Sequence, residues 1–299
     1  MQNFLFELQQ KNQNLEKNAF YVISTPIGNL ADITIRALAI LTEVDFVVCE
    51  DSRIAQKLLT SFKITEKKFI VYNDHSDQKT REKILNLLLN NHNLALISDA
   101  GTPMISDPGL KLIDYLRKNS RKIIPIPGVS SLTCAISVAG LACDQFIFLG
   151  FLPNSIIQKQ KIFLQNNRNC SWIFFESANR LLETLEILDQ NLSQNGVHPR
   201  ICIARELTKI YEEIIVNQLP EVINYFQLYP EKIKGELVVI VEKESKNQRN
   251  FSIENIEQSI KLLINEHKSL KEISSELAEI YGIHKKEIYQ LALKIKNQL

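Results

Sequence analysis

The stretch Leu94–Gly109, LALISDAGTPMISDPG, decides how the rest of the chain is interpreted. It begins with LALIS (94–98), an apolar run typical of a buried strand. It continues with Asp, Gly, Pro, Asp, Pro and Gly in a chain of 299 residues that has only 9 glycines and 9 prolines. This concentration directly after a strand indicates either a simple turn or a loop that holds a ligand.

Similar apolar runs lie on both sides of this stretch. Strands are expected at 20–24, 45–50, 68–72 and 122–126, and helices at 34–41, 53–62, 79–91 and 109–119. Strands this apolar, alternating with helices, favour a parallel sheet covered on both faces. In such sheets ligands bind beyond the carboxyl ends of the strands. We therefore expect four loops to share one rim: STPIGNL, CEDSR, SDAGTP and IPGVSS.

The second half of the chain has a different pattern. A helix of small residues is expected at 127–141, near a domain junction. Further strands are expected at 145–151, 171–176, 200–207, 211–217 and 235–243, and helices at 156–166, 179–190 and near 220–227. The last strands follow one another without long helices between them, which favours a mixed sheet. The sequence thus predicts a first α/β domain over 19–127 and a second over 128–243.

Two polar segments flank these domains. Residues 1–18, rich in Asn and Gln, are expected to form a flexible leader, and 244–250 a linker. Residues 251–299 predict three short helices, with Gly282 in the tight turn between the last two. Short helices separated by a tight turn are typical of a helix-turn-helix, although a helical cap packed on the main body has the same pattern.

Composition excludes several classes of protein. Hydrophobic residues make up 45% and charged residues 23%, the balance of an ordinary globular protein. The net charge of +1 creates no global field for nucleic acid, so any RNA must be held by a local patch. The N-terminus lacks the basic region followed by an apolar core that is typical of a secretory signal. The sequence contains no run of about 18 apolar residues that would predict a membrane span, so we expect a cytoplasmic protein. The five cysteines form no C-x-x-C pair and are expected to be small buried hydrophobes.

The rim loops carry the candidates for ligand contact. Gly28 and Gly101 allow the backbone to approach a ligand closely, and Asp99 offers a carboxylate at the end of a strand. The loops form neither G-x-G-x-x-G nor a Walker loop. Each loop alone could be turn chemistry, but four of them on one rim favour a binding site.

Several segments then point to a known family. TPIGNLADITIRALAIL, CEDSR, SDAGTPMISDPG, PIPGVSS, GFLP, FFESANRLLETL, ARELTK and KGELVVIVE occur in this order. Together they resemble the ribosomal RNA small subunit methyltransferase I family over roughly residues 20–243, and the tail resembles that family's small C-terminal domain. The resemblance implies a two-domain α/β fold like that of tetrapyrrole methylases, with a parallel-sheet N-terminal domain, a mixed-sheet second domain and a small helical C-terminal domain. It also implies a homodimer.

The resemblance implies an activity and a set of site residues. S-adenosylmethionine would bind in the cleft between the two domains, and its methyl group would pass to the ribose 2′-hydroxyl of a cytidine in the decoding region of 16S rRNA, within the small ribosomal subunit. The expected cofactor contacts are Pro26, Gly28, Asn29, Asp99, Ala100, Gly101, Thr102, Pro103, Gly128, Ser130, Ser131, Ala204 and Gly235.

A ribose hydroxyl is a poor nucleophile, so a base or a nearby cation should help it. The candidates for this catalytic role are Asp32, Glu50, Arg53 and Glu206, although Glu50 and Arg53 could instead form a structural ion pair. The methyl donor carries its own leaving group, and no metal-ligand cluster is visible in the sequence, so no metal is expected.

This sequence departs from the family pattern in places. Ser52 stands where the family has Thr, and NDHSD (73–77) replaces a His-Asn-Glu-like stretch. Tetrapyrrole enzymes carry a G-x-G-x-G-D loop after the first strand, whereas this chain has STPIGNLAD. Two alternatives remain: a tetrapyrrole-type small-molecule methylase, which the missing loop disfavours, and a non-catalytic RNA-binding protein, which the intact rim loops disfavour.

Overall fold

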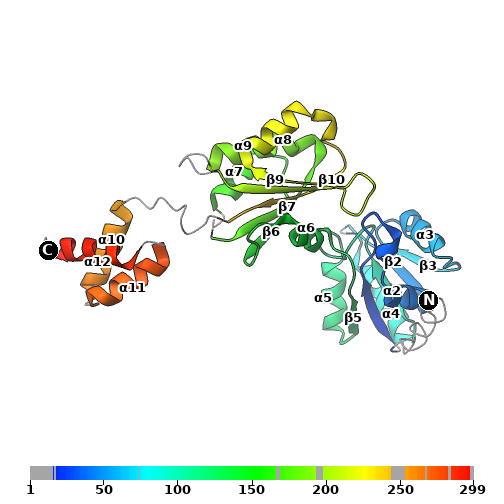
Figure 1. Ribbon diagram of the computed structural model, residues 1–299. Coiled ribbons are helices and arrows are strands. Elements are labelled where there is room, and N and C mark those ends of the chain that lie inside the picture. Colours follow the sequence, from blue (N-terminus) through cyan, green and yellow to red (C-terminus); the bar gives the residue numbers. More distant parts are fainter. Residues whose placement is uncertain are drawn as a thin grey trace.

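The computed structural model describes residues 16, 18–73, 75–165, 169–192, 198–243, 253–266, 268–281 and 284–296. Two five-stranded sheets, each with its own helices, form the main body, and three further helices follow them in the chain (Figure 1). The helices and strands of the first unit are β1 (Ala19–Ile23), α2 (Ile35–Glu43), β2 (Phe46–Cys49), α3 (Ser52–Ser61), β3 (Lys68–Val71), α4 (Gln78–Leu89), β4 (Leu94–Ile97), α5 (Leu110–Lys118) and β5 (Lys122–Ile126).

The first sheet is parallel throughout, in the order β3-β2-β4-β1-β5. Its central strands β1, β2 and β4 are buried on both faces, while the edge strands β3 and β5 are buried only in part. Successive side chains of a strand point to opposite faces of the sheet. In β1, Ala19, Tyr21 and Ile23 join the apolar cluster of α2 and α3. Phe20 and Val22 join the cluster of α4 and α5 on the other face. The expected parallel sheet with two covered faces is confirmed.

Side-chain caps fix where the helices of this unit begin. Thr34 accepts a hydrogen bond from the Ala37 amide at the start of α2. Asp51 accepts one from the Arg53 amide at the start of α3, and Asp77 one from the Thr80 amide at the start of α4. Each cap satisfies a backbone N–H that has no partner within its helix.

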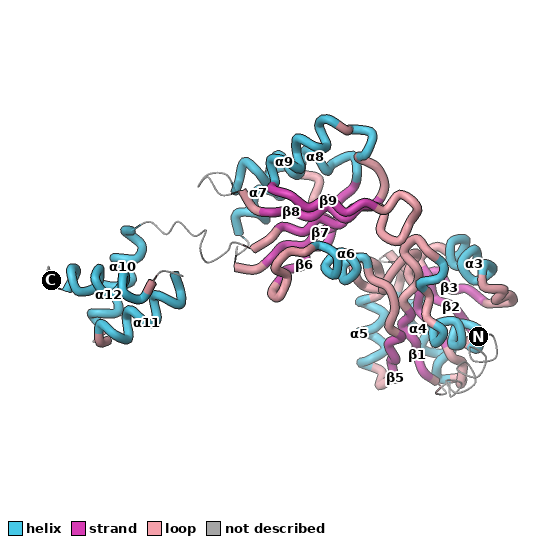
Figure 2. Tube along the Cα trace, viewed as in Figure 1, coloured by secondary structure: helices cyan, strands magenta, loops and turns pink. Residues whose placement is uncertain are grey.

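The second sheet has the order β6-β7-β10-β8-β9 and is mixed, as expected. Only its β6–β7 pair is parallel, and its other three pairs are antiparallel. Its helices and strands are α6 (Ser131–Ala139), β6 (Phe146–Phe151), α7 (Ile156–Gln165), β7 (Ser171–Ser177), α8 (Ala178–Leu192), β8 (Arg200–Arg205), β9 (Glu213–Gln218), α9 (Leu219–Leu228) and β10 (Glu236–Val241). Helices α7, α8 and α9 cover one face of this sheet, while α6 packs on the other (Figure 2).

Several elements of this unit are shorter than the sequence predicts, and in two of them a single backbone conformation explains the difference. The helix expected over 127–141 spans Ser131–Ala139, because Ser130 is extended and Gly140 adopts the left-handed conformation that ends a helix. The strand expected over 200–207 ends at Arg205, because Glu206 has a φ of 50° and turns the chain out of the sheet. Both differences lie in loops beside the functional site described below.

The tail forms α10 (Ile253–Asn265), α11 (Leu270–Tyr281) and α12 (Lys285–Lys296). These helices build a core of their own from Ile256, Ile260, Ile273, Leu277, Ile288, Ala292 and Ile295. The proposed linker 244–250, nearly all of the leader 1–18 and the turn residue Gly282 lie outside the described residues. Among the residues that are described, no helix is long and apolar enough to cross a membrane.

A buried lysine ties the helical layer of the second unit to β7. Lys159 is fully buried, and its ammonium donates to Glu183 Oε2 (2.8 Å) and Thr184 Oγ1 (3.0 Å). The Thr184 hydroxyl donates in turn to the buried carboxylate of Glu176 (2.8 Å). The side chain of Glu183 is 49% exposed, so water reaches one end of this network while the ammonium remains covered.

This asymmetry predicts unequal effects of removing either partner. Glu183→Leu should destabilise the protein by about 1–3 kcal/mol, because it leaves a buried ammonium with one acceptor fewer. Lys159→Met should cost less than about 1 kcal/mol, because an apolar chain of similar length fills the space and Glu183 turns to water. Urea denaturation followed by circular dichroism measures both values. A larger loss for Lys159→Met than for Glu183→Leu would contradict this reading of the network.

Candidate functional site

Two rim loops of the first sheet are joined by a short backbone bridge. The Thr25 amide donates to the Gly101 carbonyl (2.8 Å), and the Gly101 amide donates to the Thr25 carbonyl (3.0 Å). The Thr25 hydroxyl also donates to the Ser98 carbonyl (3.1 Å). The loop after β1 and the loop after β4, which the parallel sheet places at one rim, are therefore fixed to each other by this bridge.

A second set of bonds brings in the loop that leads to α6. The Thr102 hydroxyl donates to the Val129 carbonyl (2.9 Å) and is 2.9 Å from the Ser24 hydroxyl. Gly128 lies directly against Ser24, because a Cβ at this glycine would stand 2.9 Å from the Ser24 Cβ. Three rim loops thus form one connected wall at the carboxyl ends of β1, β4 and β5.

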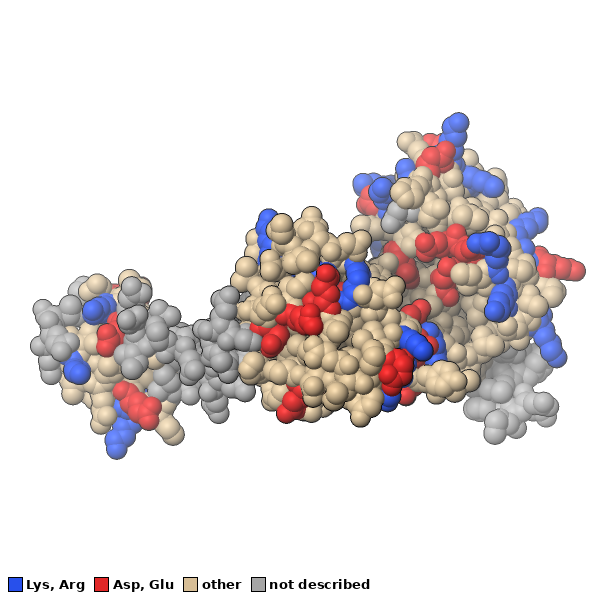
Figure 3. Space-filling view, turned by 90° about the horizontal axis from the view of Figure 1, so that it is seen from above, with Lys and Arg blue, Asp and Glu red and all other residues tan. Residues whose placement is uncertain are grey.

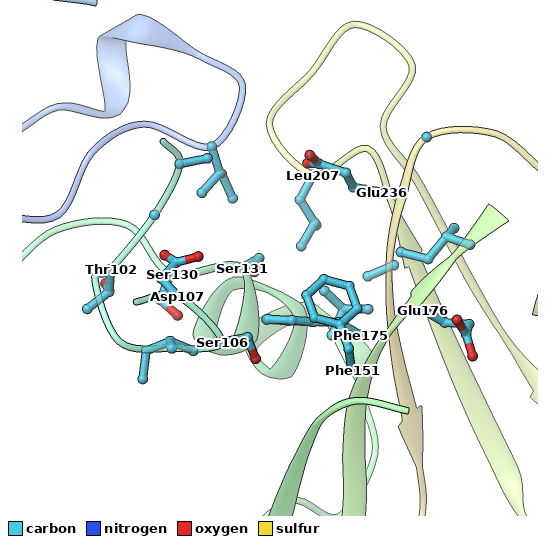
Figure 4. A pocket seen from close by; sticks show the side chains of 18 of the residues that line it. Thr102, Ser106, Asp107, Ser130, Ser131, Phe151, Phe175, Glu176, Leu207 and Glu236 are labelled. Carbon is cyan, nitrogen blue, oxygen red and sulfur yellow. The ribbon is translucent and has the colours of Figure 1, made fainter. Parts of the chain in front are cut away.

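This wall faces the second sheet across a cavity of about 380 Å³ (Figure 4). Such a volume lies at the lower end of the range typical of sites for small molecules and cofactors. The first-domain and α6 side is lined by Ile27, Asp99, Ala100, Gly101, Thr102, Ile105, Ser106, Asp107, Ser130 and Ser131. The opposite side is lined by Phe151, Phe175, Glu176, Ser177, Ala204, Leu207, Gly235, Glu236, Leu237 and Val238.

The cavity gathers most of the binding residues expected from the sequence. Eight of them line it: Asp99, Ala100, Gly101, Thr102, Ser130, Ser131, Ala204 and Gly235. The other five do not: Pro26, Gly28, Asn29, Pro103 and Gly128. Gly128 supports the wall from behind, and Gly28 makes a contact between the domains that is described below.

The four expected catalytic residues, Asp32, Glu50, Arg53 and Glu206, are absent from the cavity lining. Arg53 is exposed and donates to the Asp51 carboxylate, whose pKa falls to about 2 through these hydrogen bonds. Glu206 accepts from the Lys209 ammonium and from the Glu236 amide. Arg53 and Glu206 are therefore each held in an ion pair, and neither residue lines the cavity.

A carboxyl group that sequence reasoning left unassigned, Asp107, does line the cavity. Burial raises the pKa of Asp107 to about 6, and the negative charges of Glu50 and Asp99 add to the effect of burial, against a hydrogen bond from Ser98. Burial also raises the pKa of Asp99. The sequence already shows Asp107 in the same loop as Asp99. Only the fold shows that this loop returns to the cavity, so that both carboxyl groups line it.

Gly28 lies at one of the places where the two domains touch. A Cβ on Gly28 would overlap the Lys209 side chain and would lie 3.0 Å from Thr208 Oγ1 and 3.2 Å from the Leu207 carbonyl. Its neighbour Ile27 and the facing Leu207 both line the cavity. The absence of a side chain at Gly28 therefore allows the STPIGNL loop to close one side of the cavity.

The loops on both sides of the cavity contain left-handed residues. Met104, Ser106, Glu206 and Thr208 have φ values of 70°, 66°, 50° and 64°, although none of them is glycine. In the same loops Gly101 and Gly109 have φ values of 80° and 140°. Side chains disfavour this conformation, so the surrounding packing must hold these loops in shape.

The charges around the site are mixed in sign. Figure 3 shows acidic side chains gathered where the surface of the first domain is hollowed, with Lys and Arg side chains beside them. Within the described residues, no group of three or more His, Cys, Asp or Glu side chains is placed to hold a metal ion. The cavity thus combines acidic residues (Asp99, Asp107, Glu176 and Glu236) with serine hydroxyls, backbone amides and apolar side chains.

Comparison with known proteins identifies the family of this chain. Residues 19–223 match the family of Tetrapyrrole (Corrin/Porphyrin) Methylases. The chain is 43% identical to the ribosomal RNA small subunit methyltransferase I of Rickettsia prowazekii over 286 residues, which cover 94% of this chain and 98% of the relative. It is 38% identical to the Haemophilus influenzae protein of the same name, over 91% of this chain and 95% of that relative.

Solved structures share the fold at lower sequence identity. The methyltransferase CobJ superposes with a TM-score of 0.54 at 18% identity, covering 75% of this chain and 93% of its own. Uroporphyrin-III C-methyl transferase from Thermus thermophilus, solved in complex with S-adenyl homocysteine, gives 0.50 at 14% identity, covering 75% of this chain and 97% of its own. From the family match and the near full-length relatives, the chain belongs to the tetrapyrrole methylase family and, within it, to the ribosomal RNA small subunit methyltransferase I family.

Proposed function

We propose that this protein is an S-adenosylmethionine-dependent methyltransferase that modifies small-subunit ribosomal RNA. The observation that carries the proposal is the relationship to ribosomal RNA small subunit methyltransferase I over nearly the full length of both chains. The cavity between the two sheets supplies the physical support, since a methyl donor and an acceptor must meet in one place.

The residues that line the cavity fit the parts of S-adenosylmethionine. Apolar side chains such as Ile27, Leu237 and Val238 suit the faces of an adenine ring, and the carboxyl group of Asp99 suits cationic or hydrogen-donating groups. Ser130 and Ser131 stand at the N-terminus of α6, where helix amides and the helix dipole favour a carboxylate. The thirteen cofactor residues expected from the sequence stay a prediction, and the eight that line the cavity are the ones we propose as contacts.

When bound, S-adenosylmethionine supplies a methyl group on a sulfonium sulfur. This sulfur leaves as a neutral thioether when the methyl group is transferred, so the proposed reaction requires no metal. The chain must orient the acceptor oxygen and remove its proton. We propose that the Asp107 carboxylate accepts this proton as the general base. It lines the cavity, and its raised pKa makes it a stronger base than an ordinary carboxylate. We propose structural roles for Arg53 and Glu206, which their ion pairs support.

The acceptor we propose is the ribose 2′-hydroxyl of a cytidine in the decoding region of 16S rRNA, presented in the small ribosomal subunit in the cytoplasm. The loop STPIGNLAD after β1, in place of a glycine-rich loop, supports RNA over a tetrapyrrole as the substrate. We also propose that the protein acts as a homodimer. Exposed apolar side chains at Val138 of α6 and Phe146 of β6 support a contact between copies.

The tail is the part of the chain that we propose contacts RNA away from the cavity. Its three helices bury their apolar residues against one another, so the tail has a core of its own. Lys285 and Lys286 begin α12, where lysine side chains and helix amides both favour phosphate.

The first test measures methyl transfer and cofactor binding in one protein. Wild-type protein should transfer tritiated methyl groups from S-adenosylmethionine to small ribosomal subunits that lack the modification. Asp99→Ala should weaken S-adenosylmethionine binding about ten- to a hundred-fold, the cost of one hydrogen bond to a charged group. Gly101→Val should weaken it too, because Gly101 has a φ of 80° and a Cβ there would stand 3.3 Å from Ile27.

Asp114→Ala is the matched control for this test, since Asp114 is an exposed carboxylate on α5 paired only locally with Lys118. It should bind S-adenosylmethionine like wild type in calorimetry. Unchanged binding in both Asp99→Ala and Gly101→Val would contradict the cavity as the cofactor site. Binding of the cofactor without methylation of any small-subunit RNA would contradict the proposed substrate.

The raised pKa of Asp107 predicts a pH dependence. The carboxylate must be ionised to accept a proton, so kcat/KM should be level at neutral pH and fall as the pH decreases through about 6. Asp107→Asn should lower kcat by about 10²–10⁴-fold, the usual contribution of a general base. Asp114→Asn should keep the wild-type profile. A full loss of cofactor binding in Asp107→Asn, or an unchanged rate, would show that Asp107 is not the base.

Removal of the tail tests its role in RNA binding. A chain that ends at residue 246 should bind S-adenosylmethionine like the full chain, because all residues that line the cavity lie before the tail. Its methylation of small subunits should fall, and its RNA binding should depend less steeply on salt, since fewer phosphates are contacted. Lys285→Ala with Lys286→Ala should reproduce part of this loss. A shortened chain that melts earlier yet binds the subunit normally would identify the tail as a stabilising cap.

A further inference from the structure

One large apolar side chain lines the cavity and yet remains exposed to solvent. Phe151 is 59% exposed, whereas the other large apolar residues of the lining are buried or half-buried. Figure 4 shows Phe151 and Phe175 together on the second-domain side, across the cavity from Thr102, Ser130 and Asp107. Single exposed apolar residues are common on protein surfaces, and it is the place of this ring at the border of a cavity that makes it a candidate for ligand contact.

The local backbone brings this ring to the cavity. In the β6–β7 pair, Phe148 is opposite Ile173 but Phe151 is opposite Phe175, so β6 contains one extra residue. Gly150, with a φ of 64°, lies in this bulge. Side chains three apart would normally lie on opposite faces of a strand, but the bulge places Phe148 and Phe151 on the same face.

The result is a fixed set of three rings. Phe175 contacts Phe148 edge-to-face at 4.9 Å between ring centroids and Phe151 at 5.3 Å. Both arrangements are favourable geometries for aromatic pairs. Phe175 therefore supports Phe151 from behind and leaves part of its ring open to solvent.

An ion pair holds the chain that follows Phe151. The Arg180 guanidinium donates to the Leu152 carbonyl (3.1 Å) and also to the Asn154 side chain. Its second amino group is 2.6 Å from the Glu176 carboxylate, which is fully buried. In Figure 4 the carboxylate of Glu176 turns away from the cavity. Glu176 thus acts through Arg180 to hold the GFLP segment, so Phe151 is presented on a rigid support.

We propose that Phe151 is the stacking platform for the base of the nucleotide whose ribose is methylated. The inference rests on the proposed function. Proteins that bind single-stranded or looped RNA receive unstacked bases on aromatic side chains. A nucleotide that turns its ribose into this cavity would bring its base to such a side chain. Phe151 offers one flat apolar face at the border of the proposed methyl-donor site.

Polar groups near the ring suit the edge of that base. Ser106 approaches the bulge, because a Cβ on Gly150 would stand 3.4 Å from the Ser106 hydroxyl. Asp107 follows Ser106 and also lines the cavity. Recognition of an unstacked base has two components. An aromatic ring stacks on the face of the base, and hydroxyl or carboxyl groups bond to the edge of the base.

Four variants of the full chain test this platform. Phe151→Ala should raise KM for small ribosomal subunits that lack the modification by about 10- to 100-fold, the loss expected for one stacked base. Phe151→Leu keeps apolar volume without a flat ring and should lose most of the same affinity. Phe151→Trp should methylate within about threefold of wild type, since it restores a stacking face. Tyr229→Ala is the matched control, because Tyr229 is an aromatic residue at the end of α9 that is 47% exposed and does not line the cavity.

Two further measurements separate a stacking platform from other roles. Calorimetry with S-adenosylmethionine should give wild-type affinity for all four variants, and light scattering should give the wild-type mass. Weaker cofactor binding in Phe151→Ala would assign the ring to the cofactor, and a changed mass would assign it to a contact between copies. Wild-type activity in Phe151→Leu would assign it to ordinary apolar packing. Each of these results overturns the proposal.

Failure of the proposed function has a different signature. If wild-type protein transfers no methyl group to small-subunit RNA, the substrate is wrong and the Phe151 inference falls with it. A second outcome is that wild-type protein methylates the subunits while Phe151→Trp is no more active than Phe151→Leu and Phe151→Ala. In that case only the proposal that Phe151 stacks on the base is wrong.

Discussion

Two backbone hydrogen bonds between Thr25 and Gly101 hold the first-domain side of the cavity together. These residues belong to loops that follow different strands, and parallel strands do not by themselves connect the loops at their ends. The bridge fixes the SDAGTP loop against the STPIGNL loop, and the hydroxyl of Thr102 extends the connection to the segment before α6. The shape of the wall therefore depends mostly on backbone and hydroxyl groups.

This construction explains why the two domains contribute so differently. The first domain offers backbone, hydroxyl and carboxyl groups from loops that are tied to one another. The second offers strand residues and the aromatic set of Phe148, Phe151 and Phe175, held in place by the sheet and by the Glu176–Arg180 ion pair. Most of the polar groups come from the first side and the aromatic rings from the second, which together give the mostly apolar lining with a few placed polar groups that is typical of ligand sites.

Much of the fold follows from short-range patterns in the sequence. Apolar runs that alternate with amphipathic segments predict the parallel sheet, and consecutive strands without long helices predict the mixed one. Helix and strand limits were less accurate at Ser130, Gly140 and Glu206, where a single backbone conformation ends an element. Such conformations depend on packing with distant loops, which a local pattern does not contain.

The site was predictable to a lesser degree, for the same reason. Asp99 and Gly101 could be chosen because each lies at the end of a strand whose neighbours were already expected. Phe151 could not, because its position depends on one extra residue in β6 relative to β7. Asp107 required knowledge of how its loop folds back. An ion pair was considered for Arg53 with Glu50, whereas Arg53 pairs with Asp51, and no ion pair was expected for Glu206, which pairs with Lys209.

The left-handed residues beside the cavity have a consequence for adaptation to temperature. Met104, Ser106, Glu206 and Thr208 each hold a conformation that costs about 1 kcal/mol or more for a side chain other than glycine. A protein of this kind has a total stability of about 5–15 kcal/mol, so four such residues are a sizeable fraction of it. A lineage selected for growth at higher temperature would gain stability most readily by relaxing these loops, yet they give the cavity its shape. Heat tolerance in this family should therefore evolve in the sheets and helices, while the strained loops stay as they are.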